Sequence, residues 1–362
     1  NMANQDYRVD VCCHFTSHFC GCAFIRWIMV KIGIVGVGHL GKIHLRCIRE
    51  ISGYHIAGIV DLDEEMARKV AAENHLPLFS SLDALLQEVD AVSIVTPTTT
   101  HYELAHRAIE QGKHVFIEKP VTDTSEKALR LNESAARHGV KVQVGHVERF
   151  NPALLALQGE IINPAFVEVH RLANYNPRSN DVSVIQDLMI HDLDILLHFI
   201  DSPIRDVRAN GLSIISPTED ICNARIEFEN GAVANVTASR ISVKNMRKMR
   251  LFQSNAYISL DFLEKRSQVI RIDDEKMGEE ALKLDLGDRE KFITISNIEG
   301  PQTNAIKQEF ESFYQSITKG TPEVVTLRDG IRALELAEQI ERAVSTQGKL
   351  TGFLNSVDQD PS

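Results

Sequence analysis

Three glycines at fixed spacing join a short β-branched run to a helical segment. The run covers residues 31–36, and Gly36-Val37-Gly38-His39-Leu40-Gly41 then opens a segment with helical character through Glu50. The first glycine permits a tight turn, the second lets a ligand approach the backbone, and the third lets helix and strand pack closely. The pattern predicts an anion-binding turn at the N-terminus of the helix.

An acidic residue follows the next strand. The predicted strand 54–60 ends at Asp61, twenty residues beyond Gly41, where a carboxylate accepts hydrogen bonds from an adenosine ribose. The combination indicates a dinucleotide site. Because Asp61 repels a 2′-phosphate and no arginine follows it directly, NAD is favoured over NADP. A role for Asp61 as a helix N-cap remains open.

Strands and helices continue to alternate through residue 147. Apolar strands such as 92–95 indicate a parallel sheet covered on both faces, which is a doubly wound α/β fold. Ligands of such sheets lie beyond the carboxyl ends of the strands, which places Thr96-Pro97 and Glu118-Lys119-Pro120 beside the cofactor. The expected helices are 64–74, 82–88, 102–111 and 125–138, and the expected strands lie near 78 and at 91–96, 114–118 and 141–147.

After Pro152 the pattern changes to alternating strands. Ala224, Ile226 and Phe228 alternate with charged residues, and Asn230-Gly231 supplies a hairpin turn. We expect a second α/β domain with an open, mainly antiparallel sheet, which pairs with another copy in a homodimer or homotetramer. Its expected strands are 166–173, 206–215, 223–229, 232–241, 249–253, 257–262 and 269–272, followed by amphipathic helices at 305–318 and 331–344.

The length of 362 residues favours two domains. Residues 29–149 are assigned to a dinucleotide-binding Rossmann domain and 150–352 to a substrate-binding and oligomerisation domain. Residues 353–362 read as a flexible tail. Residues 1–28 read as a disordered or artefactual extension, with Met29 as the natural start.

Charge and cysteine content narrow the class of protein. With 39 Lys and Arg against 50 Asp and Glu, the net charge of −11 lacks the cationic field that nucleic-acid binding needs. No stretch of about 18 residues is apolar and uncharged, which excludes a membrane span. Cys47 and Cys222 lie far apart, as expected for reduced thiols in a cytoplasm. Zinc binding by the N-terminal cysteines at 12, 13, 20 and 22 is an alternative, although their spacing is unusual.

The segment 185–200 carries the clearest chemical pattern. Asp187, His191, Asp194 and His198 recur at i, i+4, i+7 and i+11, on one stripe of a helix. Acid–base chemistry would have His191 take a hydroxyl proton while an adjacent carboxylate orients it. A solvated helix face is the plainer alternative, and zinc on Asp187 and His191 is another, without an evident third ligand.

Lys119 is the second candidate for chemistry. Pro120 ends the strand ladder, so the ammonium is held at the carboxyl edge of the sheet. A cation there would stabilise a developing alkoxide and orient a hydroxyl group. An ordinary surface lysine with a buried aliphatic stem is the alternative.

Taken together, these motifs resemble the Gfo/Idh/MocA oxidoreductases. The resemblance rests on the glycine turn, Thr96-Pro97 with His101, Glu118-Lys119-Pro120, Arg149-Phe150 and the Asp187-to-Asp194 pattern. It implies a Rossmann domain that binds NAD(P), a second domain that presents a sugar, and a cis Lys119-Pro120 bond. It also implies Lys119 and His191 as the catalytic pair, Asp187 as their assistant, and no metal. The cofactor-binding residues it implies are Gly36, Gly38, His39, Leu40, Asp61, Thr96, Pro97, His101 and Glu118; the substrate-binding residues are Lys119, Arg149, Arg178, Asp187 and His191.

Within this family, residues 144–152 and 187–194 resemble the UDP-N-acetylglucosamine 3-dehydrogenase branch. The resemblance implies NAD-dependent oxidation of a secondary sugar hydroxyl, at C3 of such a nucleotide sugar. A diphosphate would need cations. Alternatively, the cations between Arg240 and Arg250 only offset acidic neighbours or protect a strand edge. The available cations are Arg171, Arg178, Arg240, Lys244, Arg247 and Lys248.

Other functions remain open at this stage. A non-catalytic NAD-binding regulator is possible because this fold can bind a cofactor without performing chemistry. A family member acting on a free polyol or a glycoside, including cleavage or epimerisation, is the third alternative.

Overall fold

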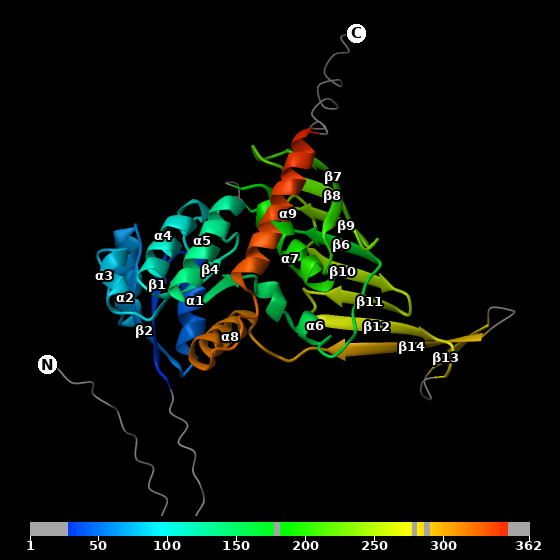
Figure 1. Cartoon of the computed structure of the whole chain (residues 1–362), viewed down its shortest axis with the longest axis horizontal. Helices are drawn as coiled ribbons and strands as arrows, with labels where there is room; N and C mark the ends of the chain where they lie inside the picture. The colour runs from blue at the N-terminus through cyan, green and yellow to red at the C-terminus, as the bar shows by residue number, and fades with distance from the viewer. Residues whose placement is uncertain (1–27, 177–181, 277–280, 286–289, 347–362) are drawn as a thin grey trace, which may run out of the picture.

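The computed structural model describes residues 28–176, 182–276, 281–285 and 290–346, which form two β-sheets and their helices (Figure 1). Several predictions lie outside these described residues: the extension up to residue 27 with its cysteines, Arg178, and the tail 353–362.

The first sheet has five parallel strands in the order β2-β1-β3-β4-β5. Every residue of β3 is buried, as expected for a parallel strand covered on both faces. The predicted doubly wound Rossmann sheet is confirmed. Its strands are β1 (Val30–Val35), β2 (Tyr54–Val60), β3 (Ala91–Ile94), β4 (His114–Glu118) and β5 (Val142–Gly145).

Two hydrophobic cores flank this sheet. One contains buried residues of α1 (His39–Arg49) and α2 (Glu64–Asn74). The other contains those of α3 (Leu82–Leu86), α4 (Thr98–Glu110) and α5 (Ser125–His138). The helices therefore cover the apolar side chains that both faces of the sheet present.

A helix from near the end of the chain completes the first of these cores. Phe310 and Phe313 of α8 (Ala305–Lys319) are fully buried with Ile32 of β1 and Phe116 of β4. The rings of Phe116 and Phe310 lie 4.4 Å apart. Figure 1 shows α8, in orange, beside α1. Although 150–352 was assigned to the second domain, this part of it covers the first sheet, where Phe116 would otherwise meet water.

The second sheet is mixed, with β6 and β9 parallel and its other described pairs antiparallel. The strand order is β13-β14-β12-β11-β10-β6-β9-β8-β7. The prediction of an open, mainly antiparallel sheet is confirmed. Its strands are β6 (Phe166–Leu172), β7 (Ile204–Leu212), β8 (Ile221–Phe228), β9 (Val233–Ser239), β10 (Met246–Gln253), β11 (Ala256–Asp261), β12 (Arg266–Asp273), β13 (Leu282–Asp285) and β14 (Glu290–Glu299).

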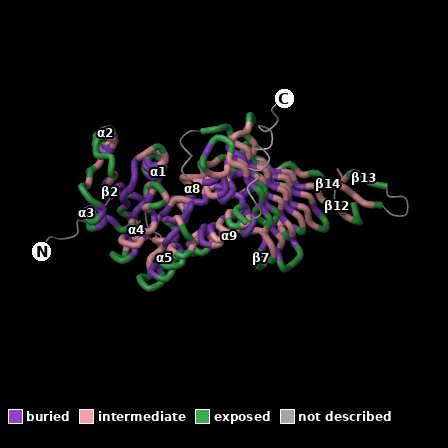
Figure 2. The backbone as a smooth tube through the Cα atoms, turned by 90° about the horizontal axis from the view of Figure 1, so that it is seen from above, coloured by how far each residue is buried: buried purple, intermediate pink, exposed green. Residues whose placement is uncertain are grey.

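One face of the second sheet is packed and the other is open. Ala224, Ile226 and Phe228 are fully buried in a core with α7 (Ile190–Phe199) and α9 (Leu327–Thr346). On the opposite face, Arg225 is exposed and Asn235 is half-buried. Figure 2 shows this alternation along the strands. Pairing of the open face with a second copy stays a prediction.

The long helix α9 connects the two cores. Its N-terminal residues Leu327, Ile331 and Leu334 belong to a core of the first sheet, whereas Ile340 and Val344 belong to that of the second. In Figure 1 it runs, in red, between the two sheets. The two sheets therefore share one continuous element.

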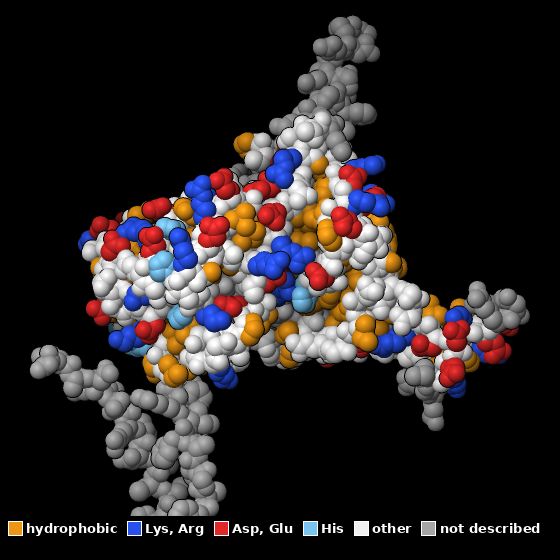
Figure 3. Space-filling view, in the orientation of Figure 1, with side chains coloured by type: hydrophobic (Ala, Val, Ile, Leu, Met, Phe, Trp, Pro, Cys, Tyr) orange, Lys and Arg blue, Asp and Glu red, His pale blue; other side chains and the backbone are white. Residues whose placement is uncertain are grey.

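The strands β13 and β14 were not predicted. All four residues of β13 are exposed and no residue of β14 is fully buried, so neither strand has the buried face that gives a clear apolar alternation. Figure 3 shows mixed acidic and basic side chains on this projecting arm, where Lys283 pairs with Glu290 and Lys291 with Asp274. Charge pairs rather than a core line this edge of the sheet.

A few boundaries also differ from the expectations. α4 begins at Thr98, directly after Pro97, and not at residue 102. Its first turn was not predicted because three threonines give no apolar period. The strand expected near Leu78 is a single bridge to Ile59. The 3₁₀ turn η1 (Val147–Phe150) and the short α6 (Pro152–Leu155) were not anticipated. Across the part of the chain that the structure describes, no helix has the length and apolar character needed to cross a membrane.

The placement of α8 can be tested by emptying its contact. Replacing Phe313 by Ala should lower the free energy of unfolding by about 3–5 kcal/mol, because a fully buried ring leaves a cavity. Urea unfolding followed by circular dichroism measures the change. Gln315→Ala, at an exposed position of the same helix, is the control and should stay within about 0.5 kcal/mol. Equal effects of both variants would contradict the packing described.

Candidate active site

A cleft of about 390 Å³ lies where the carboxyl ends of β3 and β4 meet the glycine turn and the segment 182–187. Parallel strands bring their ends to one edge of the sheet, which is why residues distant in sequence meet here. Val182 and Gln186 also line the cleft, although no sequence motif singled them out. The lining residues singled out from sequence are Gly38, His39, Leu40, Thr96, Pro97, Glu118, Lys119 and Asp187.

The glycine turn has the geometry of a phosphate cradle. Gly36 has φ +92°, and a Cβ there would lie 2.6 Å from the Val95 carbonyl oxygen. A Cβ at Gly41 would lie 2.1 Å from the Gly36 carbonyl oxygen. A Cβ at Gly38 would meet no protein atom within 4 Å, so the backbone there faces open space. These residues fit a dinucleotide, whose pyrophosphate approaches the backbone at this glycine.

Asp61 holds the glycine turn against the end of β2. Its Oδ2 accepts a hydrogen bond from Val37 N (2.6 Å), and its Oδ1 accepts one from Asp63 N (2.9 Å). The N-cap of α2 is Asp63, whose carboxylate accepts from Met66 N at 3.0 Å. The alternative that Asp61 caps this helix is therefore wrong.

His101 links two loops of the site from behind. It is buried, with Nδ1 2.9 Å from the Pro120 carbonyl oxygen and Nε2 2.9 Å from the Thr96 carbonyl oxygen. Burial lowers the pKa of His101. Its ring ties the loop after β3 to the loop after β4 and does not line the cleft.

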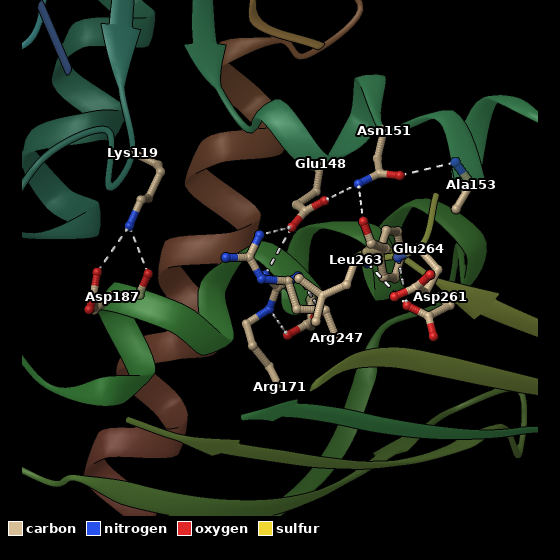
Figure 4. A network of polar contacts seen from close by, with 12 residues as sticks. Lys119, Glu148, Asn151, Ala153, Arg171, Asp187, Arg247, Asp261, Leu263 and Glu264 are labelled. Carbon is tan, nitrogen blue, oxygen red and sulfur yellow. Dashed lines mark hydrogen bonds and ion pairs between the residues drawn. The ribbon is translucent and has the colours of Figure 1, made fainter. Parts of the chain in front are cut away.

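Lys119 reaches across the cleft to the second domain. The Lys119-Pro120 bond is cis, as the family resemblance implied. The Nζ of Lys119 donates to the backbone carbonyl oxygen of Asp187 (2.7 Å) and lies 3.4 Å from its Oδ1. Figure 4 shows the two residues facing one another, and both side chains stay about one-fifth exposed, at 18% and 20%. The ammonium is thus held in the cleft and remains reachable.

The segment 185–200 is not one regular helix. It begins with a π turn, η2 (Ile185–Met189), before α7. A π turn adds a residue to one helical turn, so Asp187 is displaced from the stripe that His191, Asp194 and His198 share in α7. Asp187 lines the cleft, Asp194 is buried, and His198 is exposed. Of the four predicted groups, only Asp187 lines the cleft: Asp194 pairs with Arg149, and His198 borders another cavity.

His191 is not among the residues that line the cleft; it lies in a poorly solvated position that the charge of Lys119 reaches. Its Nδ1 is buried and has no hydrogen-bond partner among the described residues. Burial lowers the pKa of His191 well below 6.5, and the positive charges of Lys119 and Arg171 lower it further. The imidazole is therefore neutral at pH 7. The ring of His146 meets it edge-on, with centroids 6.3 Å apart.

Arg149 is not brought to Lys119. Its Nε and Nη2 donate to Asp194 Oδ2 (2.6 Å) and Oδ1 (3.0 Å) in a buried pair. It borders another cavity, of about 810 Å³, together with His198 and Phe199. The structure thus gives Arg149 a carboxylate partner inside the protein, away from the cleft.

Two buried residues beneath the cleft were missed. His44 Nε2 lies 3.1 Å from Glu118 Oε1, and its Nδ1 lies 3.0 Å from Ser93 Oγ. Burial raises the pKa of Glu118, but the hydrogen bond and charge of His44 outweigh it and lower that pKa overall. Burial raises the pKa of Glu309 well above its usual value, and the negative charge of Glu118 adds to this. A polar residue on an otherwise core-facing helix stripe is the signal that could have revealed both.

The described residues contain no group of three His, Cys, Asp or Glu side chains arranged to hold a metal ion. The zinc alternative for Asp187 and His191 therefore gains no third ligand from this part of the chain. Cys47 and Cys222 are buried free thiols.

The Rossmann sheet and its glycine turn are those expected of an NAD-binding oxidoreductase. Residues 30–146 match the profile of an oxidoreductase family with an NAD-binding Rossmann fold, and residues 157–259 match the GFO/IDH/MocA C-terminal domain. The chain belongs to the Gfo/Idh/MocA oxidoreductase family.

The proteins similar to this chain include dehydrogenases named for a nucleotide sugar and for an inositol. UDP-N-acetylglucosamine 3-dehydrogenase of Acidithiobacillus ferrooxidans is 37% identical over 318 residues, covering 88% of this chain and 98% of the relative. A solved structure of that enzyme aligns with TM-score 0.80 at 36% identity, covering 88% of this chain and 99% of the other. The scyllo-inositol 2-dehydrogenase (NAD(+)) of Bacillus subtilis is 30% identical over 232 residues, covering 59% and 68%.

The glycine turn supplies a matched pair of variants. Gly38→Ala should weaken NAD binding about tenfold or more while leaving the free energy of unfolding within about 1 kcal/mol, because its Cβ meets only the ligand space. Gly36→Ala should destabilise the fold itself, because it combines positive φ with a backbone clash. Calorimetric titration with NAD and thermal unfolding measure the two effects. Undiminished NAD binding by Gly38→Ala would contradict the assignment.

Proposed function

We propose that this protein is an NAD-dependent dehydrogenase that oxidises a secondary hydroxyl of a sugar, at C3 of a UDP-N-acetylglucosamine-type nucleotide sugar. The observation that carries the proposal is the contact of Lys119 with Asp187 across the cleft, which holds a cation in the space beside the glycine turn. The relative that covers 88% of this chain supports the substrate, since it is named for that reaction.

NAD is the proposed cofactor in preference to NADP. The carboxylate of Asp61, fixed beside the glycine turn, disfavours a 2′-phosphate there. Gly36, Gly38, His39 and Leu40 would hold the pyrophosphate, with Thr96, Pro97 and Glu118 alongside. When bound, NAD supplies a hydride acceptor at C4 of its nicotinamide ring.

Lys119 and His191 would divide the proton chemistry. Lys119 donates a hydrogen bond to the substrate oxygen and stabilises the alkoxide as it develops. His191 would accept the hydroxyl proton, and the hydrogen of the carbon–hydrogen bond would leave with both electrons for the acceptor that NAD supplies when bound. The product is a ketone, and His191 returns the proton to solvent. Asp187 positions Lys119 through its carbonyl oxygen.

The electrostatics suit these roles. A base must be neutral before it can accept a proton, and burial with the charge of Lys119 keeps His191 neutral at pH 7. The same charges disfavour the imidazolium, so the proton is released readily after the transfer.

Substitution of each partner tests the pair. His191→Asn and Lys119→Ala should each lower turnover by roughly two to four decades while NAD affinity stays near normal. NADH absorbance with UDP-N-acetylglucosamine measures turnover, and calorimetry measures NAD binding. His198→Asn, on the same helix but exposed, is the control and should keep its activity. Full turnover in both active-site variants would refute the roles.

The charge coupling between the two residues gives a separate test. Replacing Lys119 by Met removes a positive charge that lowers the pKa of His191, so that pKa should rise. Histidine ring signals in NMR titrations report it, with His191→Asn identifying the resonance. A pKa that stays in place, or moves down, would contradict their proximity.

A free polyol is the second candidate substrate. It is favoured by the similarity to scyllo-inositol 2-dehydrogenase, which is 30% identical over 59% of this chain. NADH absorbance with inositols, free sugars and UDP-sugars in parallel decides between the candidates. Mass analysis of the product distinguishes oxidation, which removes two hydrogens, from cleavage or epimerisation of a glycoside. Absence of NAD reduction with every alcohol would favour a non-catalytic role.

A further inference from the structure

The ends of three central strands of the second sheet lie next to the cleft. Ser242 N, before β10, donates to the carbonyl oxygen of Ala173, just after β6 (3.0 Å). Arg240, which follows β9, donates through Nη1 to the Val182 carbonyl oxygen (2.8 Å). Val182 itself lines the cleft. The ends of β6 and β9 and the start of β10 therefore adjoin the site of Lys119.

Two cations near these strand ends are neutralised inside the protein. Arg171 donates to both oxygens of Asp192 (2.6 and 2.9 Å) and to Glu148 (2.9 Å), and all three side chains are buried. Arg240 is likewise buried against Asp220 (2.9 Å). Neither guanidinium is available to a ligand without breaking a buried ion pair, which is strongly unfavourable.

Two further cations lie on the open face of the second sheet, opposite the face that carries Arg171. Lys248 and Arg250 alternate with the buried residue Met249 along β10, so they point to the open face of the sheet. There Lys248 pairs with Asp261 (3.2 Å) and Arg250 approaches Glu168 (3.7 Å).

Arg247 differs from all of these. It is paired in register with Arg171 across β6 and β10, on the same face, but its side chain is 45% exposed. Its contact is Nη1 to Oε1 of Glu148 at 3.4 Å. That carboxylate is already satisfied by Arg171 and by Asn151, which donates to Oε2 at 2.8 Å (Figure 4). Glu148 therefore does not require Arg247, and nearly half of the Arg247 side chain is exposed.

Arg247 lies in the neighbourhood of His191. Its neighbour Arg171 binds Asp192, the residue directly after His191. After burial and the charges of Lys119, Arg171 and His146, the charge of Arg247 also lowers the pKa of His191. Lys244 is exposed three residues earlier in the same edge segment.

We propose that Arg247, assisted by Lys244, binds the phosphate groups of a nucleoside diphosphate carried by the sugar substrate. This inference rests on the proposed function, whose substrate it refines. A planar guanidinium presents parallel donors that match phosphate oxygens, and a half-exposed one can bind without leaving a buried carboxylate unpaired. The diphosphate is held at the start of β10 while Lys119 and His191 act on the sugar ring.

The experiment uses the full chain saturated with NAD, so that the glycine turn is already filled, and titrates UDP by calorimetry. Arg247→Met should weaken UDP binding roughly tenfold to a hundredfold, and Arg247→Lys should weaken it less. Lys244→Met should have a smaller effect in the same direction. Arg250→Met, on the same strand but the opposite face, is the matched control and should stay within about twofold. With UDP-N-acetylglucosamine as substrate, Arg247→Met should raise KM more than it lowers kcat.

Two results would overturn the phosphate site: no UDP binding by the NAD-saturated wild type, or wild-type UDP affinity in both Arg247→Met and Lys244→Met. Thermal unfolding of each variant confirms that it is folded. The proposed function fails separately. If UDP binding depends on Arg247 but no UDP-sugar reduces NAD, the phosphate site stands and the reaction does not. If UDP-N-acetylglucosamine is oxidised equally by wild type and both variants, the reaction stands and the phosphate site does not.

Discussion

The hydrogen bond from Lys119 Nζ to the Asp187 carbonyl oxygen joins the two domains at the cleft. A backbone oxygen does not move with side-chain rotamers, so it fixes the ammonium more firmly than the carboxylate at 3.4 Å could. One partner stands at the end of a parallel strand and the other in a π turn. The shape of the cleft, the charge next to His191 and the proposed chemistry all depend on these two backbone features meeting.

Local periodicity was enough to predict much of the first domain. β2, α2, β4 and α5 have the residue bounds expected from sequence, because each is bracketed by clear turn or cap signals. β13 and β14 escaped because neither has a consistently buried face. The π turn escaped because an extra residue in one helical turn changes direction without changing composition. The amphipathic stripe of α8 showed that it packs on a core, but a stripe does not say which core.

The candidate site divides in a similar way. Residues at strand ends, such as Thr96 and Lys119, were placed in one cleft by topology alone, and they do line it. For charged residues of the second domain, the sequence did not distinguish those paired inside the protein from those exposed to a ligand. A helical or strand projection treats Asp194, Arg149 and Arg247 alike, yet the first two pair inside the protein and the third stays half exposed. Whether a charge meets a partner or a ligand depends on contacts across the fold.

The return of α8 to the first sheet affects how the chain is made. During synthesis, residues 30–146 emerge with their glycine turn and all five strands, but Phe116 lacks the covering that Phe310 and Phe313 later provide. During synthesis one face of the first sheet therefore stays incompletely covered until α8 has been translated. A nascent chain that ends after β5 exposes an aromatic surface to which chaperones can bind. Its folding is completed only when the later codons, which encode α8, have been translated.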